Sequence, residues 1–129
     1  MTLTRRVRPL LGLTAVGVAV LAATGVFRVS AQQPPGVQRH VEVTARKYSF
    51  TPGRIEVTQD DLVKITLHSD DIAHSLTIDA YRIAKRVGGG QTVTFEFRAD
   101  QAGTFPIYCN LRQDEGCRQM RGELVVKPR

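Results

Sequence analysis

Short apolar alternations separated by turn residues are the feature that most limits how this chain can fold. The clearest one is Thr92-Val93-Thr94-Phe95-Glu96-Phe97, in which Val93, Phe95 and Phe97 point to one face of a strand. Similar runs predict strands near residues 41–45, 55–57, 62–67, 75–78, 104–108 and 123–127. No long amphipathic helix interrupts them. About seven short strands joined by turns predict an all-β sandwich or barrel.

Residues 1–31 are expected to be a targeting segment. Three arginines within the first eight positions precede an uncharged, mostly apolar run from Leu10 to Phe27, and small residues lead to Ala31. This order is typical of a secretory signal peptide. The apolar run is also long enough to remain as an anchor, so a membrane tether through residues 10–27 is an open alternative. Either interpretation places the rest of the chain outside the cytoplasm, in the periplasm or an equivalent compartment.

The remainder is expected to form one small domain at residues 40–129, preceded by a flexible, proline-containing tether at residues 32–39. Without the four arginines of the leader, 14 of the 18 basic residues remain against 12 acidic ones, a net charge of about +2. No basic block or aromatic stacking array is left, so a nucleic-acid partner is not expected. The small positive balance has no use, or steers the domain weakly toward an acidic redox partner.

Both cysteines and the only methionine after Met1 lie within twelve residues of each other, in the pattern Cys109-x7-Cys117-x2-Met120. Thiolate and thioether sulfurs select copper, iron-sulfur clusters or zinc over magnesium and calcium. His74 could add an imidazole, because loops from different strands gather at one end of a β-sandwich. Outside the cytoplasm the two cysteines could equally form a disulfide.

Several motifs resemble one known family. Residues 103–109 read Gly-Thr-Phe-Pro-Ile-Tyr-Cys, residues 120–126 read Met-Arg-Gly-Glu-Leu-Val-Val, and Asp-Ile-Ala-His-Ser-Leu lies upstream at residues 71–76. Together they resemble the cupredoxins with a binuclear copper centre, namely the periplasmic domain of cytochrome c oxidase subunit II and the C-terminal domain of nitrous oxide reductase. The resemblance extends from Val41 to Lys127. It implies a single Greek-key β-sandwich that binds copper and transfers electrons.

The copper loop of that family reads Cys-x3-Cys-x3-His-x2-Met, and this chain departs from it twice. Gln113 occupies the position of the second bridging cysteine, and Cys117 occupies the position of the loop histidine. The resemblance therefore does not imply a normal binuclear centre. It implies one copper ion, as Cu(I) or Cu(II), held by the residues at the matching positions, with a backbone carbonyl as a further candidate: His74, Cys109, Cys117, Met120 and the carbonyl of Leu111.

Three functions follow from these residues. The first is an exported, monomeric copper protein that acts in electron transfer or copper handling and has no catalytic activity of its own. Its expected partner is a redox protein or a copper donor or acceptor. The second is a metal-free binding or accessory module in which a Cys109–Cys117 disulfide closes a loop of about nine residues and contributes roughly 2 to 3 kcal/mol. The third is an accessory component of a respiratory oxidase. Disulfide and metal site can also coexist as a redox switch, because reduction would release the sulfur ligands.

The other polar residues near the loop are interpreted conservatively. His40 and His68 are expected at surface or strand positions without a role in the site. Arg118 and Arg121 are expected to be charged edge residues rather than a docking patch. Four acidic residues are expected to be solvated loop charges: Asp70, Asp71, Asp114 and Glu115.

Overall fold

The computed structural model describes Gly12 and residues 36–129. The expected signal segment at residues 1–31, including the possible tether at residues 10–27, lies outside the described residues except for Gly12. Residues 36–129 belong to one compact unit, which contains every element described below. Among the described residues, no helix combines the length and the apolar character needed to cross a bilayer.

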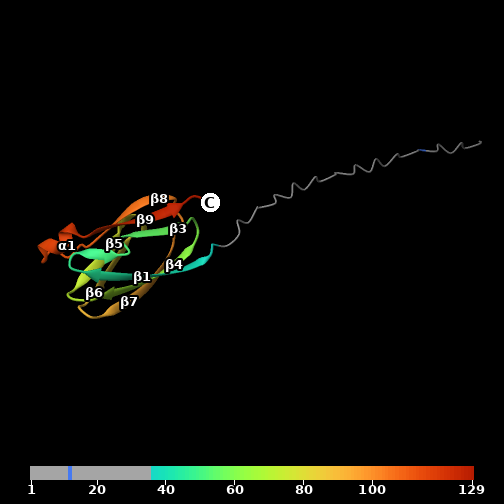
Figure 1. The fold of residues 1–129 in the computed structure, drawn as a ribbon. Coiled ribbons are helices and arrows are strands. Elements are labelled where there is room, and N and C mark those ends of the chain that lie inside the picture. Colours follow the sequence, from blue (N-terminus) through green and yellow to red (C-terminus); the bar gives the residue numbers. More distant parts are fainter. Residues whose placement is uncertain (1–11, 13–35) are drawn as a thin grey trace, which may run out of the picture. The chain divides into compact units, whose positions relative to one another are not determined.

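Nine strands in two sheets make up the described part of the chain (Figure 1). The first sheet has the order β2-β1-β4-β7 and the second has the order β3-β9-β8-β5-β6. The strands are β1 (Gln38–Arg46), β2 (Ser49–Thr51), β3 (Arg54–Thr58), β4 (Leu62–Ser69), β5 (His74–Ile78), β6 (Ile83–Val87), β7 (Thr92–Arg98), β8 (Gly103–Tyr108) and β9 (Arg121–Lys127). The prediction of an all-β sandwich is confirmed.

Alternation along each strand explains how the sheets bury a common core. In β4, Val63, Ile65 and Leu67 are completely buried while the residues between them are partly exposed. Ile65 pairs with Phe95 of β7 in antiparallel register, so apolar side chains lie side by side on the inner face. β5 differs, because all five of its residues are buried. His74 therefore begins a strand that is enclosed throughout its length.

Several details differ from the prediction. β2 and β6 are additional strands, and β6 ends at Val87, directly before the glycine run of residues 88–90. Gln38 and Arg39, expected in the tether, are the first residues of β1. Two short helices also appear, a 3-10 helix over Asp79–Tyr81 and α1 over Glu115–Gln119. These elements are short, so their sequences are too brief to show a periodicity.

The fold brings the two predicted site segments to the same end of the sandwich. β8 ends at Tyr108 and leads into Cys109, the chain then passes through α1, and β9 returns from Arg121. β8 pairs with both β9 and β5, and Tyr108 at its end lies opposite Thr77. The start of β5 therefore lies beside the residues that follow β8, where Ser75 contacts Cys109 and Asn110. Figure 1 shows α1 at one end of this unit and the C-terminus at the other.

Candidate metal centre

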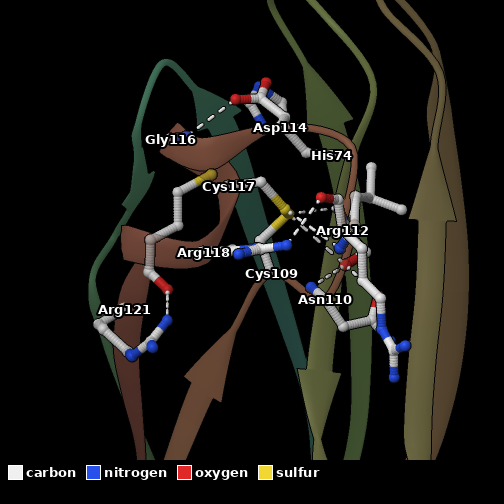
Figure 2. Close-up of a disulfide and its surroundings, with 12 residues drawn as sticks. His74, Cys109, Asn110, Arg112, Asp114, Gly116, Cys117, Arg118 and Arg121 are labelled. Atoms are coloured by element: carbon white, nitrogen blue, oxygen red, sulfur yellow. Dashed lines mark hydrogen bonds between the residues drawn. A yellow bond between two sulfur atoms is a disulfide. The ribbon is translucent and has the colours of Figure 1, made fainter.

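Cys109 and Cys117 form a disulfide (Figure 2). Their Cα atoms are 5.2 Å apart, and the residues are 2% and 0% exposed. The disulfide that the sequence left as an alternative is therefore present in the structure. It covalently joins the end of β8 to α1 and belongs to the hydrophobic core.

N–H groups of the surrounding backbone point at both sulfur atoms. The backbone N–H of Ser75 donates to Cys109 Sγ at 3.4 Å, and that of Leu111 donates to Cys117 Sγ at 3.2 Å. The Ser75 hydroxyl lies 3.6 Å from Cys109 Sγ and accepts from the Asn110 N–H at 2.8 Å. Hydrogen bonds to an ionised acceptor are roughly twice as strong as those to a neutral one, so these donors favour thiolates more than disulfide sulfurs.

The loop between the cysteines owes its shape to a helix cap. Asp114 is the N-cap of α1 and accepts the Gly116 N–H at 2.9 Å, so it is not the free loop charge that was expected. Glu115 agrees better with that expectation, since it is 84% exposed and only 3.5 Å from Arg118. Gln113 is exposed, so its side chain does not replace the bridging cysteine of the family.

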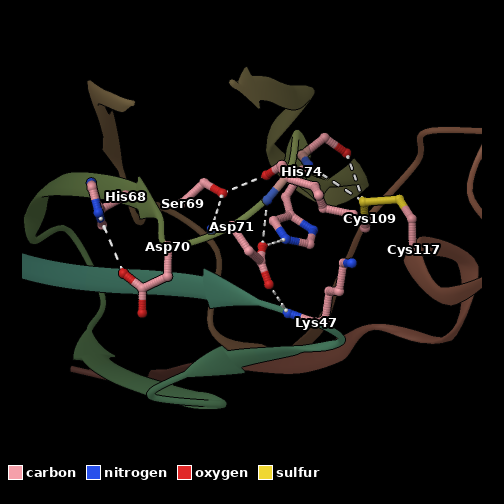
Figure 3. Close-up of polar contacts among 10 residues, drawn as sticks. Lys47, His68, Ser69, Asp70, Asp71, His74, Cys109 and Cys117 are labelled. Carbon is pink, nitrogen blue, oxygen red and sulfur yellow. Dashed lines mark hydrogen bonds and ion pairs between the residues drawn. A yellow bond between two sulfur atoms is a disulfide. The ribbon is translucent and has the colours of Figure 1, made fainter. Parts of the chain in front are cut away.

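His74 is completely buried, and only one of its two ring nitrogens has a partner (Figure 3). Nε2 lies 2.7 Å from Asp71 Oδ1, whereas Nδ1 is buried without a hydrogen-bond partner among the residues that the structure describes. Figure 3 shows the imidazole between Asp71 and the disulfide. Leaving a buried polar atom unpaired costs about 1 to 3 kcal/mol, so this nitrogen calls for an explanation.

Asp71 is an acceptor for three N–H groups and not the solvated loop charge that the sequence suggested. Burial raises the pKa of its carboxyl, but hydrogen bonds from Lys47 N, Ile72 N and His74 outweigh burial and lower the pKa to about 2. The side chain is 24% exposed. Asp70, by contrast, is exposed as expected, 3.4 Å from His68.

The four predicted ligands lie in one buried region, but they do not form a metal site while the disulfide is intact. The Met120 N–H donates to the Cys117 carbonyl, which places Met120 directly after α1, and its side chain is fully buried. No group of three or more His, Cys, Asp or Glu residues that could hold a metal occurs within the described residues. These residues fit copper only when the Cys109–Cys117 disulfide is reduced. Two thiolates are then available beside the free imidazole nitrogen and the thioether.

The two other histidines lie apart from this region, whereas Arg118 and Arg121 flank it at the surface. His40 and His68 are on the outer face of the first sheet, where they contact Thr66 and Thr92. Arg118 donates to the Arg112 carbonyl, and Arg121 donates to the Met120 carbonyl. Both arginines are exposed, as expected.

Sequence reasoning missed two residues that shape the site, Asp71 and Ser75. Each had a local signal. Asp71 lies three positions before His74, and Ser75 follows it directly, so both are close to any site that uses this histidine.

The comparisons with known proteins agree with this geometry. The family model described as a cupredoxin-like domain matches residues 17–126. The chain belongs to this family.

Among curated proteins, two cytochrome c oxidase subunit 2 sequences from Thermus thermophilus are each 29% identical over 90 residues. The match spans 70% of this chain and 67% of one relative, but only 54% of the other.

Two solved structures illustrate the fold. Auracyanin A, a "blue" copper protein from Chloroflexus aurantiacus, has a TM-score of 0.59 at 17% identity, over 70% of this chain and 99% of its own. Subunit II of cytochrome c oxidase, in a mixed-disulfide intermediate with a thioredoxin-like protein, has a TM-score of 0.60 at 12% identity, over 77% of this chain and 88% of that chain.

Proposed function

We propose that this protein is an extracytoplasmic cupredoxin whose copper site becomes available when the Cys109–Cys117 disulfide is reduced, and that it acts in electron transfer or copper handling. The residues that would hold the ion are His74, Cys109, Cys117 and Met120, with the Leu111 carbonyl as a further candidate. Bound copper would supply a one-electron couple or a transferable Cu(I) ion. The protein would act as a carrier and not as an enzyme.

The observation that supports this proposal is the buried, unpartnered Nδ1 atom of His74. A structural histidine normally uses both nitrogens or reaches water. Here one nitrogen is held by a carboxylate and the other has no partner within the described residues, on a ring that lies between Asp71 and the disulfide (Figure 3). Metal-binding histidines have this arrangement, in which the second nitrogen is held by a carboxylate or carbonyl.

Opening the site requires a reductant, and a dithiol protein is the chemical class we propose. One partner thiolate attacks a sulfur of the disulfide and forms a mixed disulfide, and the second partner thiol then displaces it. The partner becomes a disulfide, and this chain gains two electrons and two protons as two thiols. The thiol protons pass to solvent when the sulfurs become ligands. A mixed disulfide with a thioredoxin-like protein occurs in the structure of an oxidase subunit II with the same fold.

The cellular setting is part of the same proposal. Thioredoxin-like reductants and copper donors meet such a domain outside the cytoplasm, either free after cleavage near Ala31 or tethered through residues 10–27. We propose a monomer with a redox protein as partner. The oxidase relatives support, as an extension, an accessory role beside a respiratory oxidase.

The test is to count thiols and bound copper before and after mild reduction. We expect no free thiol and no copper before reduction, then two thiols and one Cu(I) per chain afterwards. Cys109→Ser should abolish copper binding even under reductant. His68→Ala is the matched control, because this histidine is on the outer face and should leave binding unchanged.

A second candidate function is favoured by the disulfide itself. If the reduced protein also takes up no copper, the buried cystine is a structural crosslink, and the domain is a metal-free binding or accessory module. Equal copper binding by the parent and by Cys109→Ser would instead move the site elsewhere on the chain.

A further inference from the structure

We propose that Asp71 is the positioning residue of this site: it fixes the tautomer of His74 so that the Nδ1 lone pair points into the protein, and the missing side chain of Gly89 leaves room for the Asp71 backbone. The inference concerns the metal-free protein. Only its consequence for copper affinity rests on the proposed function.

The hydrogen bonds around the carboxylate determine which ring nitrogen carries the proton. Asp71 Oδ1 accepts the Ile72 N–H at 2.7 Å, and Oδ2 accepts the Lys47 N–H at 2.8 Å. Backbone amides can only donate, and an ionised carboxylate can only accept. The 2.7 Å contact between Oδ1 and His74 Nε2 is therefore a bond that Nε2–H donates. In the neutral imidazole, Nδ1 then has no hydrogen and keeps its lone pair.

The opposite tautomer would be unfavourable on both sides of the ring. Nε2 without a hydrogen would place its lone pair against the carboxylate at 2.7 Å. Nδ1–H would become a buried donor, and Nδ1 has no acceptor within the described part of the chain. A single side chain, Asp71, thus distinguishes the two tautomers.

Three segments far apart in the sequence hold Asp71 in place. The Lys47 amide comes from the turn between β1 and β2, 24 residues away. Ser69, at the end of β4, donates its hydroxyl hydrogen to the Ile72 carbonyl and exchanges backbone hydrogen bonds with the segment after β6, through Gly90 N and Gln91 O. The loop that contains Asp71 is therefore fixed from both sides.

Gly89 gives the glycine run of residues 88–90 a specific role in this arrangement. A Cβ atom at Gly89 would overlap the backbone oxygen of Asp71 and would lie 3.3 Å from the Ile72 Cα. Both are backbone atoms, so no side-chain rotation can relieve the contact. A side chain at residue 89 must therefore push the two backbone segments apart, and a shift on the Asp71 side would carry the carboxylate with it.

The decisive experiment is ¹⁵N NMR of the histidine rings in the purified, metal-free protein with the disulfide intact. In the parent, we expect His74 to show a protonated Nε2 and an unprotonated Nδ1. In Asp71→Ala, the signals should move toward a mixture of both tautomers. Gly89→Ala should shift them in the same direction by a smaller amount. A His74 spectrum in Asp71→Ala identical to that of the parent would overturn the inference.

Two further variants separate positioning from folding. Asp71→Asn keeps an oxygen that can accept Nε2–H, so it should retain the parental tautomer; loss of that tautomer in a folded Asp71→Asn protein would count against the inference. Asp70→Ala removes the neighbouring exposed carboxylate, which contacts His68, and should leave the His74 signals unchanged. If Asp71→Ala does not fold, Gly89→Ala becomes the deciding variant, and unshifted His74 signals in it would overturn the inference.

Copper affinity provides the second readout. After reduction, Asp71→Ala should bind Cu(I) about 10- to 100-fold more weakly than the parent, as is usual when the partner of a histidine ligand is removed. Unchanged affinity would contradict the positioning role. If the NMR result holds but no variant, including the parent, binds copper, the proposed function fails while the tautomer assignment stands.

Discussion

In the described part of the chain, each end of the sandwich buries one ionisable side chain, and the two ends satisfy its hydrogen bonds differently. Asp61 lies in the turn between β3 and β4, at the end of the sandwich where β9 finishes. His74 lies at the opposite end, where β9 begins. Asp61 is 1% exposed, and its carboxylate accepts three hydrogen bonds, from Val37 N, Arg39 Nε and Thr58 N, at 2.9 to 3.2 Å. His74 has one bond where it could have two. A fully satisfied group supports the fold, whereas a half-satisfied one indicates a function.

The largest effect on stability should come from a substitution at Asp61, whose hydrogen bonds are fully satisfied. Asp61→Ala removes the acceptor of three N–H groups and should lower the free energy of unfolding by about 3 kcal/mol. Urea unfolding at neutral pH measures this. Asp100→Ala, at an exposed position, is the control and should change stability by no more than about 0.5 kcal/mol. A similarly small effect of Asp61→Ala would mean that water replaces the carboxylate.

The sequence predicts the strands that alternate clearly but not the short or irregular ones. Strands such as residues 92–97 were predictable because alternation reports directly which side chains face the core. β2 has only three residues, and β6 alternates poorly because its middle residues are all exposed. Such strands depend on their neighbours, here β1 and β5, and tertiary pairing cannot be read from local pattern.

The site was predictable in its residue types but not in its bonding. His74 and the sulfur residues could be named because soft ligands at family spacing are specific. Asp61 and Asp71 could not be told from ordinary loop aspartates, since both follow another acidic residue in a turn-like stretch. Their roles depend on donors from Val37 and Lys47, 24 residues before each of them.

The next effect should come from the other end of the molecule. Reducing the disulfide removes a crosslink that closes about nine residues and should lower the free energy of unfolding by about 2.5 kcal/mol. Adding Cu(I) to the reduced protein should restore stability, since a ligand bound only by the folded state stabilises it. Thermal unfolding with and without reductant tests both steps. An unchanged melting temperature after reduction would contradict the stabilising role of the disulfide. An unchanged melting temperature after Cu(I) is added to the reduced protein would contradict copper binding.

Lowering the pH should reduce the stability that Asp61 and Asp71 give to the folded protein. Hydrogen bonds hold the pKa of Asp61 below its ordinary value of 3.8 despite burial, and hold that of Asp71 at about 2. A lowered folded-state pKa gives stability that is complete above the unfolded value and is lost as pH falls toward the folded one. Stability should therefore decline from about pH 4 toward pH 2.

Substitution of one carboxylate at a time apportions that decline. Asp71→Asn should flatten the decline between about pH 4 and pH 2, because the pKa of Asp71 is lowered to about 2, and Asp61→Asn should flatten the decline that begins near pH 4, because its pKa is also lowered. Unfolding free energies at half-unit pH steps provide the measurement. Parallel profiles for the parent and both variants would show that other groups control acid unfolding.

The smallest effect, and the sharpest test of the contrast, should come from His74 itself. His74→Leu fills a similar volume, removes the unpartnered Nδ1 and loses one hydrogen bond to a carboxylate that water can still reach. Removing the unpartnered nitrogen and losing the hydrogen bond have nearly equal and opposite effects on stability. The free energy of unfolding of the metal-free, oxidised protein should therefore change by no more than about 1 kcal/mol. Thr77→Val, on the same strand, is a matched comparison, because Thr77 Oγ1 is also buried and has no partner in the described part of the chain. A loss for His74→Leu as large as that for Asp61→Ala would make His74 a structural residue. A near-neutral result combined with lost copper binding would mean that the protein keeps a dispensable, half-satisfied histidine in its core for the sake of the ligand.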